Sequence, residues 1–186
     1  MVIDAITINR APVLTLWAAI VAERLGFTHD EALTLGRAVA GLNAYSKGRA
    51  LGLFKPTPKD VRAKREAKAK AKQVIQVELL HRAVPVVQTP EGLRALSKEQ
   101  PVAPASVEKY LSSKFKDALG PVSAAMAELA HSRDAEELAA GAYGLYEQFR
   151  PAIPAGDSGW GAAGTLSLAT IRKLGKEIMR RQPRVP

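Results

Sequence analysis

Apolar residues recur at helical spacing near the start of the chain. Leu14, Trp17, Val21 and Leu25 follow one another at intervals of three or four residues, which places them on one face of a helix. Gly26 then ends the pattern, as glycine commonly does at a helix C-terminus. The spacing therefore predicts a first helix over residues 13–25.

A second helix is predicted directly afterwards. Thr28 and Glu31 form a capping box, in which the Thr28 side chain accepts from the Glu31 amide and the Glu31 carboxylate reaches back. Leu35, Val39 and Leu42 continue as an apolar stripe. Because only a few residues join the two helices, we expect them to pack on each other or on a third element.

The next segment predicts a helix without a strong apolar face. Thr57 suits an N-cap and Pro58 a first helical position, and the residues up to Gln73 are almost all Ala, Lys, Arg and Glu. Its one apolar stripe is made of alanines, at Ala63, Ala67 and Ala71. We expect that side to pack lightly and the cationic side to face solvent.

β-branched residues are concentrated only in residues 74–87, which predicts a short β-hairpin with Pro85 on an edge strand. Thr89, Pro90 and Glu91 then resemble the cap of a short helix that ends near Leu96. Capping residues and breakers predict further helices over residues 106–119, 121–131, 134–149 and 168–178, with a Gly/Pro-rich loop over 151–165.

These elements predict a mainly α fold. A helical hairpin occupies residues 1–54, a basic connector helix 55–73, and a mostly helical domain with a short β-hairpin 74–186. The chain has no cysteine, which excludes disulfides and thiolate metal sites. Its longest apolar run is too short to span a bilayer, so we expect a cytoplasmic protein without membrane contact.

The positive charge is concentrated in two places. Of a formal net charge of +9, residues 55–72 carry +6 and residues 172–186 carry +5, whereas residues 74–171 carry −3. Concentrated cations attract polyanions, of which nucleic acids are the most common. A charge run is also often only a solvated face, and an acidic protein partner would be attracted by the same cations.

Two motifs in the first third bear on nucleic-acid binding. Small and apolar residues have the spacing of a helix-turn-helix, at Ala22, Leu25, Gly26, Phe27, Ala32 and Leu35. The would-be recognition helix begins with Asp30 and Glu31, which a phosphate-lined groove would repel, so an ordinary helical hairpin is the alternative.

The second motif places Tyr45 beside Lys47 and Arg49, and combines a ring for bases with charge for phosphates. The alternative is a core tyrosine with cations that complement the helix dipole. Together with the connector, this motif gives the predicted nucleic-acid-binding residues Tyr45, Lys47, Arg49, Lys55, Lys59, Arg62, Lys64, Arg65, Lys68, Lys70 and Lys72.

No enzymatic or cofactor motif fits its required context. Residues 159–164 match G-x-G-x-x-G, but no strand precedes them and the chain ends before a second strand could follow, so dinucleotide binding is rejected. His29, His81 and His131 lack ligand spacing. We expect no cofactor, no metal and no catalytic residues.

Four segments resemble a group of uncharacterised bacterial proteins of similar length. They are residues 16–26 (LWAAIVAERLG), 40–49 (AGLNAYSKGR), 84–92 (VPVVQTPEG) and 159–161 (GWG). The resemblance implies a bacterial context and supplies no site. The sequence thus predicts a non-enzymatic protein that binds nucleic acid through a basic surface. The alternative is a protein-interaction adaptor or a homodimer, in which a second copy of the chain would complete the packing of the N-terminal hairpin.

Overall fold

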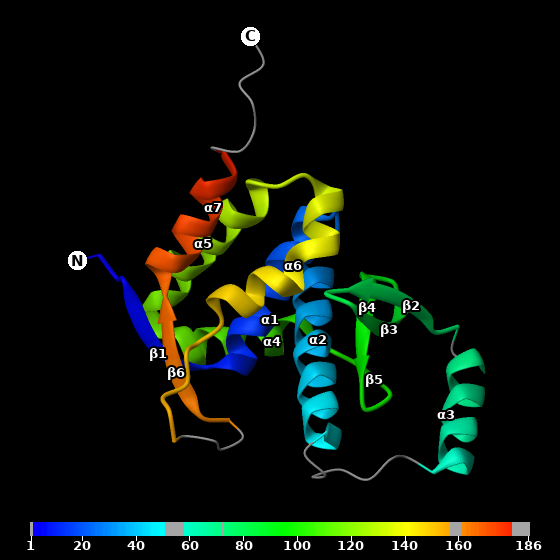
Figure 1. The fold of residues 1–186 in the computed structure, drawn as a ribbon. Helices are drawn as coiled ribbons and strands as arrows, with labels where there is room; N and C mark the ends of the chain where they lie inside the picture. Colours follow the sequence, from blue (N-terminus) through cyan, green and yellow to red (C-terminus); the bar gives the residue numbers. More distant parts are fainter. Residues whose placement is uncertain (1, 51–57, 72, 157–160, 180–186) are drawn as a thin grey trace.

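A computed structural model shows a mostly helical fold with two small antiparallel sheets (Figure 1), which makes it mixed rather than purely α. It describes residues 2–50, 58–71, 73–156 and 161–179. The helices are α1 (Arg10–Arg24), α2 (His29–Ala50), α3 (Lys59–Ala71), α4 (Pro104–Phe115), α5 (Leu119–His131), α6 (Ala135–Phe149) and α7 (Leu168–Met179), with a 3-10 turn at Lys116–Ala118. None of the described helices is both long enough and apolar enough to cross a membrane.

The predicted N-terminal hairpin is confirmed, including its capping box. The Thr28 amide donates to Glu31 Oε1 at 3.0 Å, and the Glu31 amide donates to Thr28 Oγ1 at 3.3 Å. Gly26 joins the helices with a φ of +108°, a conformation that glycine adopts without strain. Similarly, the Asp134 side chain caps α6 by accepting from the Glu137 amide at 2.8 Å.

Helix α1 lies at the centre of the core rather than in a separate N-terminal unit. Trp17 is fully buried, its indole N–H donates to the Ala142 carbonyl of α6 at 2.9 Å, and its ring meets Phe149 edge-on at 5.3 Å. α1 also packs against α2, α4 and α5. The basic segment therefore does not separate two cores, and the apolar stripes expected to attract a second copy are covered by the same chain.

The predicted β-hairpin is confirmed as β2 (Ile75–Leu79) and β3 (Arg82–Thr89), and two further strands, β4 (Gly92–Ser97) and β5 (Gln100–Pro101), extend it. The sheet order is β2-β3-β4-β5, so β3 is an inner strand and the edge position expected for Pro85 is wrong. The pairing of β3 with β4 begins only at Val86, so Pro85, which has no N–H to donate, lies just outside that ladder.

The helix predicted from Thr89 to Leu96 is wrong, because Thr89 ends β3, Pro90 and Glu91 form a turn, and the following residues form strand β4. Pro90 suits the turn as well as it suits a helix start, and Gly92 adopts a φ of +119°, which an α-helix does not allow. The strand is then held by α2. The amides of Leu93 and Ala95 donate to Glu31 Oε2 at 2.9 Å and Thr34 Oγ1 at 3.1 Å.

The second sheet pairs a strand near the N-terminus with a strand that directly precedes the last helix. Strands β1 (Ala5–Asn9) and β6 (Ala163–Ser167) pair antiparallel, although the sequence predicted a loop as far as residue 165. Gly164 permits Ala152 to approach β6 closely and bridge to Thr165, since a Cβ at position 164 would lie 2.6 Å from the Ala152 carbonyl oxygen. It lies in a strand, not at a helix start as a dinucleotide loop requires. Gly159 and Trp160, the first two residues of the G-x-G-x-x-G match, lie outside the described residues.

Candidate nucleic-acid interface

The basic connector forms helix α3, as its residues predicted. The Arg62 amide donates to the Pro58 carbonyl at 3.0 Å in the first turn, and Gln73, at a φ of +56°, lies beyond the end of the helix. The helix stands at the edge of the molecule, apart from α2 (Figure 1). Ala63 and Ala67 are exposed, so the light packing expected of the alanine side is wrong at both, while the side chain of Ala71 is not described.

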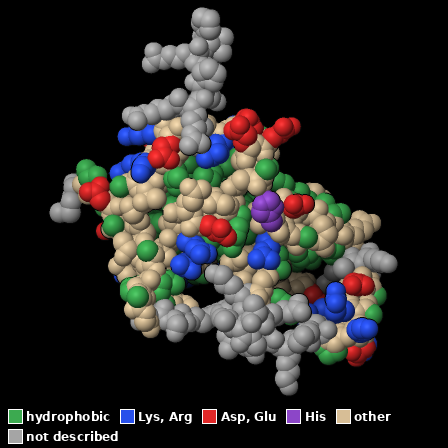
Figure 2. Space-filling model, in the orientation of Figure 1, with side chains coloured by type: hydrophobic (Ala, Val, Ile, Leu, Met, Phe, Trp, Pro, Cys, Tyr) green, Lys and Arg blue, Asp and Glu red, His purple; other side chains and the backbone are tan. Residues whose placement is uncertain are grey.

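Five of the predicted cations are exposed on α3, namely Lys59, Arg62, Lys64, Arg65 and Lys68. Figure 2 shows Lys and Arg side chains exposed on this helix at the lower right, beside acidic ones. The whole helix contains six Lys or Arg residues and two acids, a formal charge of +4. Because like charges four residues apart repel, this surface favours a bound anion.

Glu99, which the sequence did not indicate, is an acidic neighbour of α3. It lies in the β4–β5 turn, where Lys98 and Glu99 have φ angles of +49° and +66°. Its carboxylate oxygens lie 3.9 Å from Arg65 Nε and 4.0 Å from Lys68 Nζ. All three side chains are about half exposed or more, so these ion pairs contribute little to stability. The cations remain available to a polyanion that competes with Glu99.

The structure does not bring the other predicted residues into this surface. Tyr45 lies on α2 and is 39% exposed. Lys47 and Arg49 lie in the last turns of α2 and Lys70 lies in α3, but their side chains are not described. Lys55 and Lys72 lie outside the described residues. The described interface is therefore the exposed side of α3.

Helix α2 offers little surface to a DNA groove. Between residues 31 and 40 only Arg37 is exposed. His29 pairs with Glu23 through Nδ1 and with Glu108 of α4 through Nε2, at 3.2 Å for the latter. The hydrogen bond with Glu23 raises the pKa of His29, and Glu108 acts in the same direction. The N-terminus of α2 thus belongs to a structural network, which favours the ordinary hairpin over a helix-turn-helix.

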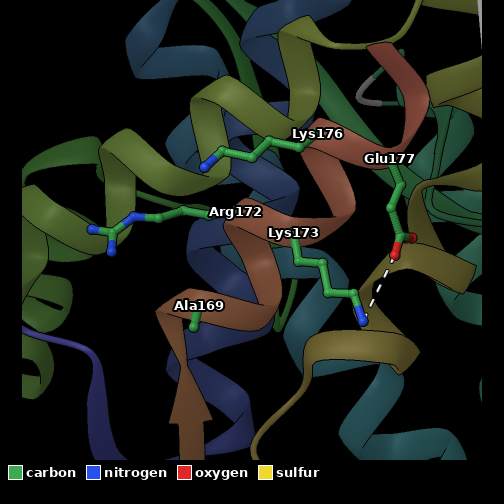
Figure 3. Close-up of a pocket in the computed structure, with 5 residues that line it drawn as sticks. All are labelled: Ala169, Arg172, Lys173, Lys176 and Glu177. Atoms are coloured by element: carbon green, nitrogen blue, oxygen red, sulfur yellow. Dashed lines mark ion pairs between the residues drawn. The ribbon is translucent and has the colours of Figure 1, made fainter. Parts of the chain in front are cut away.

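A second basic group lies on α7 and lines a surface hollow of about 440 Å³ (Figure 3). Arg172 lies 4.0 Å from the Asp4 carboxylate, and Lys173 lies 3.8 Å from Glu177. Lys176 also lines the hollow. Two acids therefore accompany three cations in this group, whereas Asp60, Glu66 and Glu99 accompany the five exposed cations of α3, so the described excess of positive charge is one on α7 and two on α3.

The structure also reveals an aromatic and cationic cluster that sequence spacing missed. The Arg37 guanidinium of α2 lies over the ring of Tyr110 in α4, with Cζ 4.6 Å from the ring centroid. Lys114 Nζ lies 5.9 Å from the same centroid. The spacing of Tyr110 and Lys114, four residues apart on one helix, was a visible signal, but nothing local links either residue to Arg37.

Comparison of the chain with models of known protein families, with curated proteins and with solved structures found no match. The relationship to a group of bacterial proteins stays a prediction. Any function assigned to this chain accordingly rests on the chemistry of its own residues.

Proposed function

We propose that this protein is a non-enzymatic binding protein that contacts nucleic acid through helix α3. One observation carries the proposal: five cations are exposed on a single helix that stands off the core and is not needed to complete it. A helix whose Ala63 and Ala67 are exposed gains little from packing. Its sequence is therefore better explained by a partner than by the fold.

Phosphates are the partner that this surface suits best. The cations lie on several sides of α3, so they supply charge along a backbone rather than a shaped pocket for one small anion. Phosphate contacts of this kind give affinity and orientation with little base preference. An acidic protein segment is the competing partner, since it would be attracted by the same cations.

The salt dependence of binding tests the proposal. If α3 neutralises about five phosphates, log affinity for duplex DNA falls with log salt concentration at a slope near −4.5. Fluorescence anisotropy with a labelled 16-base-pair duplex between 50 and 200 mM salt measures that slope. No binding near 50 mM salt, or a flat salt response, would refute the proposal.

A pair of matched variants localises the contact. Lys59→Gln with Lys64→Gln removes two exposed charges from α3, and Lys173→Gln with Lys176→Gln removes two exposed charges from α7. We expect the α3 pair to weaken binding about tenfold or more and to reduce the steepness of the salt slope by about 2. The α7 pair should change both quantities much less. Equal effects would mean that net charge alone, and not α3, drives association.

A further inference from the structure

The cluster of Arg37, Tyr110 and Lys114 places a guanidinium over an aromatic ring where α2 meets α4, with Arg37 Cζ 4.6 Å from the ring centroid. Tyr110 is partly buried and packs against the core, whereas Arg37 is exposed. The core therefore holds the ring in place, and the guanidinium lies on its solvent side. Gly41, one turn further along α2, leaves open space where a side chain would stand. The outer plane of Arg37 therefore borders an uncrowded stretch of α2.

The charges in this cluster lack acidic partners within the described part of the chain. No described carboxylate lies within ion-pair distance of Arg37 or Lys114, whereas Arg94 of β4 lies 4.0 Å from Asp30. Glu108, on the same helix as Tyr110, is paired with His29. Arg37 is thus oriented by Tyr110 but not neutralised.

An exposed guanidinium that lies over a ring, with no described acidic partner, matches one kind of ligand. Its plane stacks on a nucleobase, and its edge donates to phosphate. Bases inside a duplex are already stacked on one another, so only an unpaired base can reach this plane. We propose that Arg37, held by Tyr110 and assisted by Lys114, is a base-stacking and phosphate contact for single-stranded nucleic acid. This inference rests on the proposed function and deepens it: besides the phosphate contacts of α3, which a duplex can make, the protein would hold an unpaired base of a single strand at Arg37.

The competing explanation is that the Arg37–Tyr110 contact only fastens α2 to α4. Two substitutions separate these roles. Arg37→Lys keeps the charge but removes the planar group, and Tyr110→Leu keeps an apolar side chain but removes the ring over which Arg37 lies. Thermal unfolding followed by circular dichroism verifies that both variants fold.

The experiment measures binding of a labelled 16-nucleotide uridine oligomer and a 16-base-pair duplex at 100 mM salt, with polyglutamate as a competitor. We expect Arg37→Lys to weaken binding of the single strand at least about fivefold, as loss of a base stack does. Its duplex affinity and salt slope should stay close to wild type. Tyr110→Leu removes the ring over which Arg37 lies, so it should also weaken binding of the single strand and leave duplex affinity close to wild type.

Three results would overturn the inference. They are unchanged single-strand binding by Arg37→Lys, an equal loss for both ligands, or displacement of the oligomer by polyglutamate as effectively as by unlabelled uridine oligomer. Wild-type binding of the duplex alone would refute this inference and leave the proposed function standing. Wild-type binding of neither ligand would refute both.

Discussion

Gly36 lies where α2 packs on α1. A Cβ at this position would lie 2.4 Å from the Thr15 carbonyl oxygen and 2.9 Å from the Ala19 amide nitrogen. Both are backbone atoms, so the strain can be relieved only by shifting one helix against the other. We predict that Gly36→Ala lowers the free energy of unfolding by about 1–3 kcal/mol in urea titrations, although alanine has the higher helix propensity.

Gly144 in α6 provides the matched control for that substitution. It is exposed, and a Cβ there would meet nothing within 4 Å. We predict that Gly144→Ala raises the free energy of unfolding by up to about 1 kcal/mol, because alanine restricts the unfolded chain more and favours helix. If both variants were stabilised, the close contact between α1 and α2 at Gly36 would be contradicted.

Local signals explain which single residues the sequence predicted correctly. The Thr28–Glu31 capping box and the Asp134 cap act within three residues, so their partners are visible in the pattern itself. The role of Gly36 depends on Thr15 and Ala19 of another helix. A glycine in a helical pattern signals only a weaker helix, and its packing role becomes visible once the helices are placed.

Helix α2 completes the four-stranded sheet with its side chains. Thr34 is fully buried, donates to the Glu31 carbonyl at 2.9 Å and accepts from the Ala95 amide of β4 at 3.1 Å. Thr34→Val keeps the shape but leaves that amide unsatisfied, so we predict a loss of about 1–3 kcal/mol in the free energy of unfolding. Thr34→Ser keeps the hydroxyl and should retain slow hydrogen exchange at Ala95, which exchanges faster in the Val variant. Equal exchange in both variants would contradict this role.

The same contacts explain why β4 was mispredicted. The amide of Leu93 in β4 donates to Glu31, 62 residues away in the sequence, and the amide of Ala95 donates to Thr34, 61 residues away. Locally, a Thr-Pro-Glu sequence is as compatible with a helix N-terminus as with a hairpin turn. The pairing of β1 with β6 is still more distant, so no local pattern could predict it.

Across the whole molecule, the core and the candidate interface use different parts of the chain. The core unites residues from α1 to α7, and none of the α3 residues whose side chains are described is among its buried members. The basic helix could be predicted because helix propensity and charge are properties of the segment itself. Its acidic neighbour Glu99 and the Arg37–Tyr110 contact could not, because each joins residues brought together only by the fold.

Glu99 should act as an intramolecular competitor for the phosphates that α3 is proposed to bind. Glu99→Gln keeps the size of the side chain and removes the charge beside Arg65 and Lys68. Because exposed ion pairs contribute at most about 1 kcal/mol, the melting temperature should change little. Loss of the competing carboxylate should strengthen duplex binding several-fold at 50 mM salt, while the salt slope stays near −4.5, because that slope already includes the contacts of Arg65 and Lys68. Anisotropy titrations at several salt concentrations measure both effects. An unchanged duplex affinity in this variant would mean that Arg65 and Lys68 do not face the nucleic acid, and it would confine the interface to the other cations of α3.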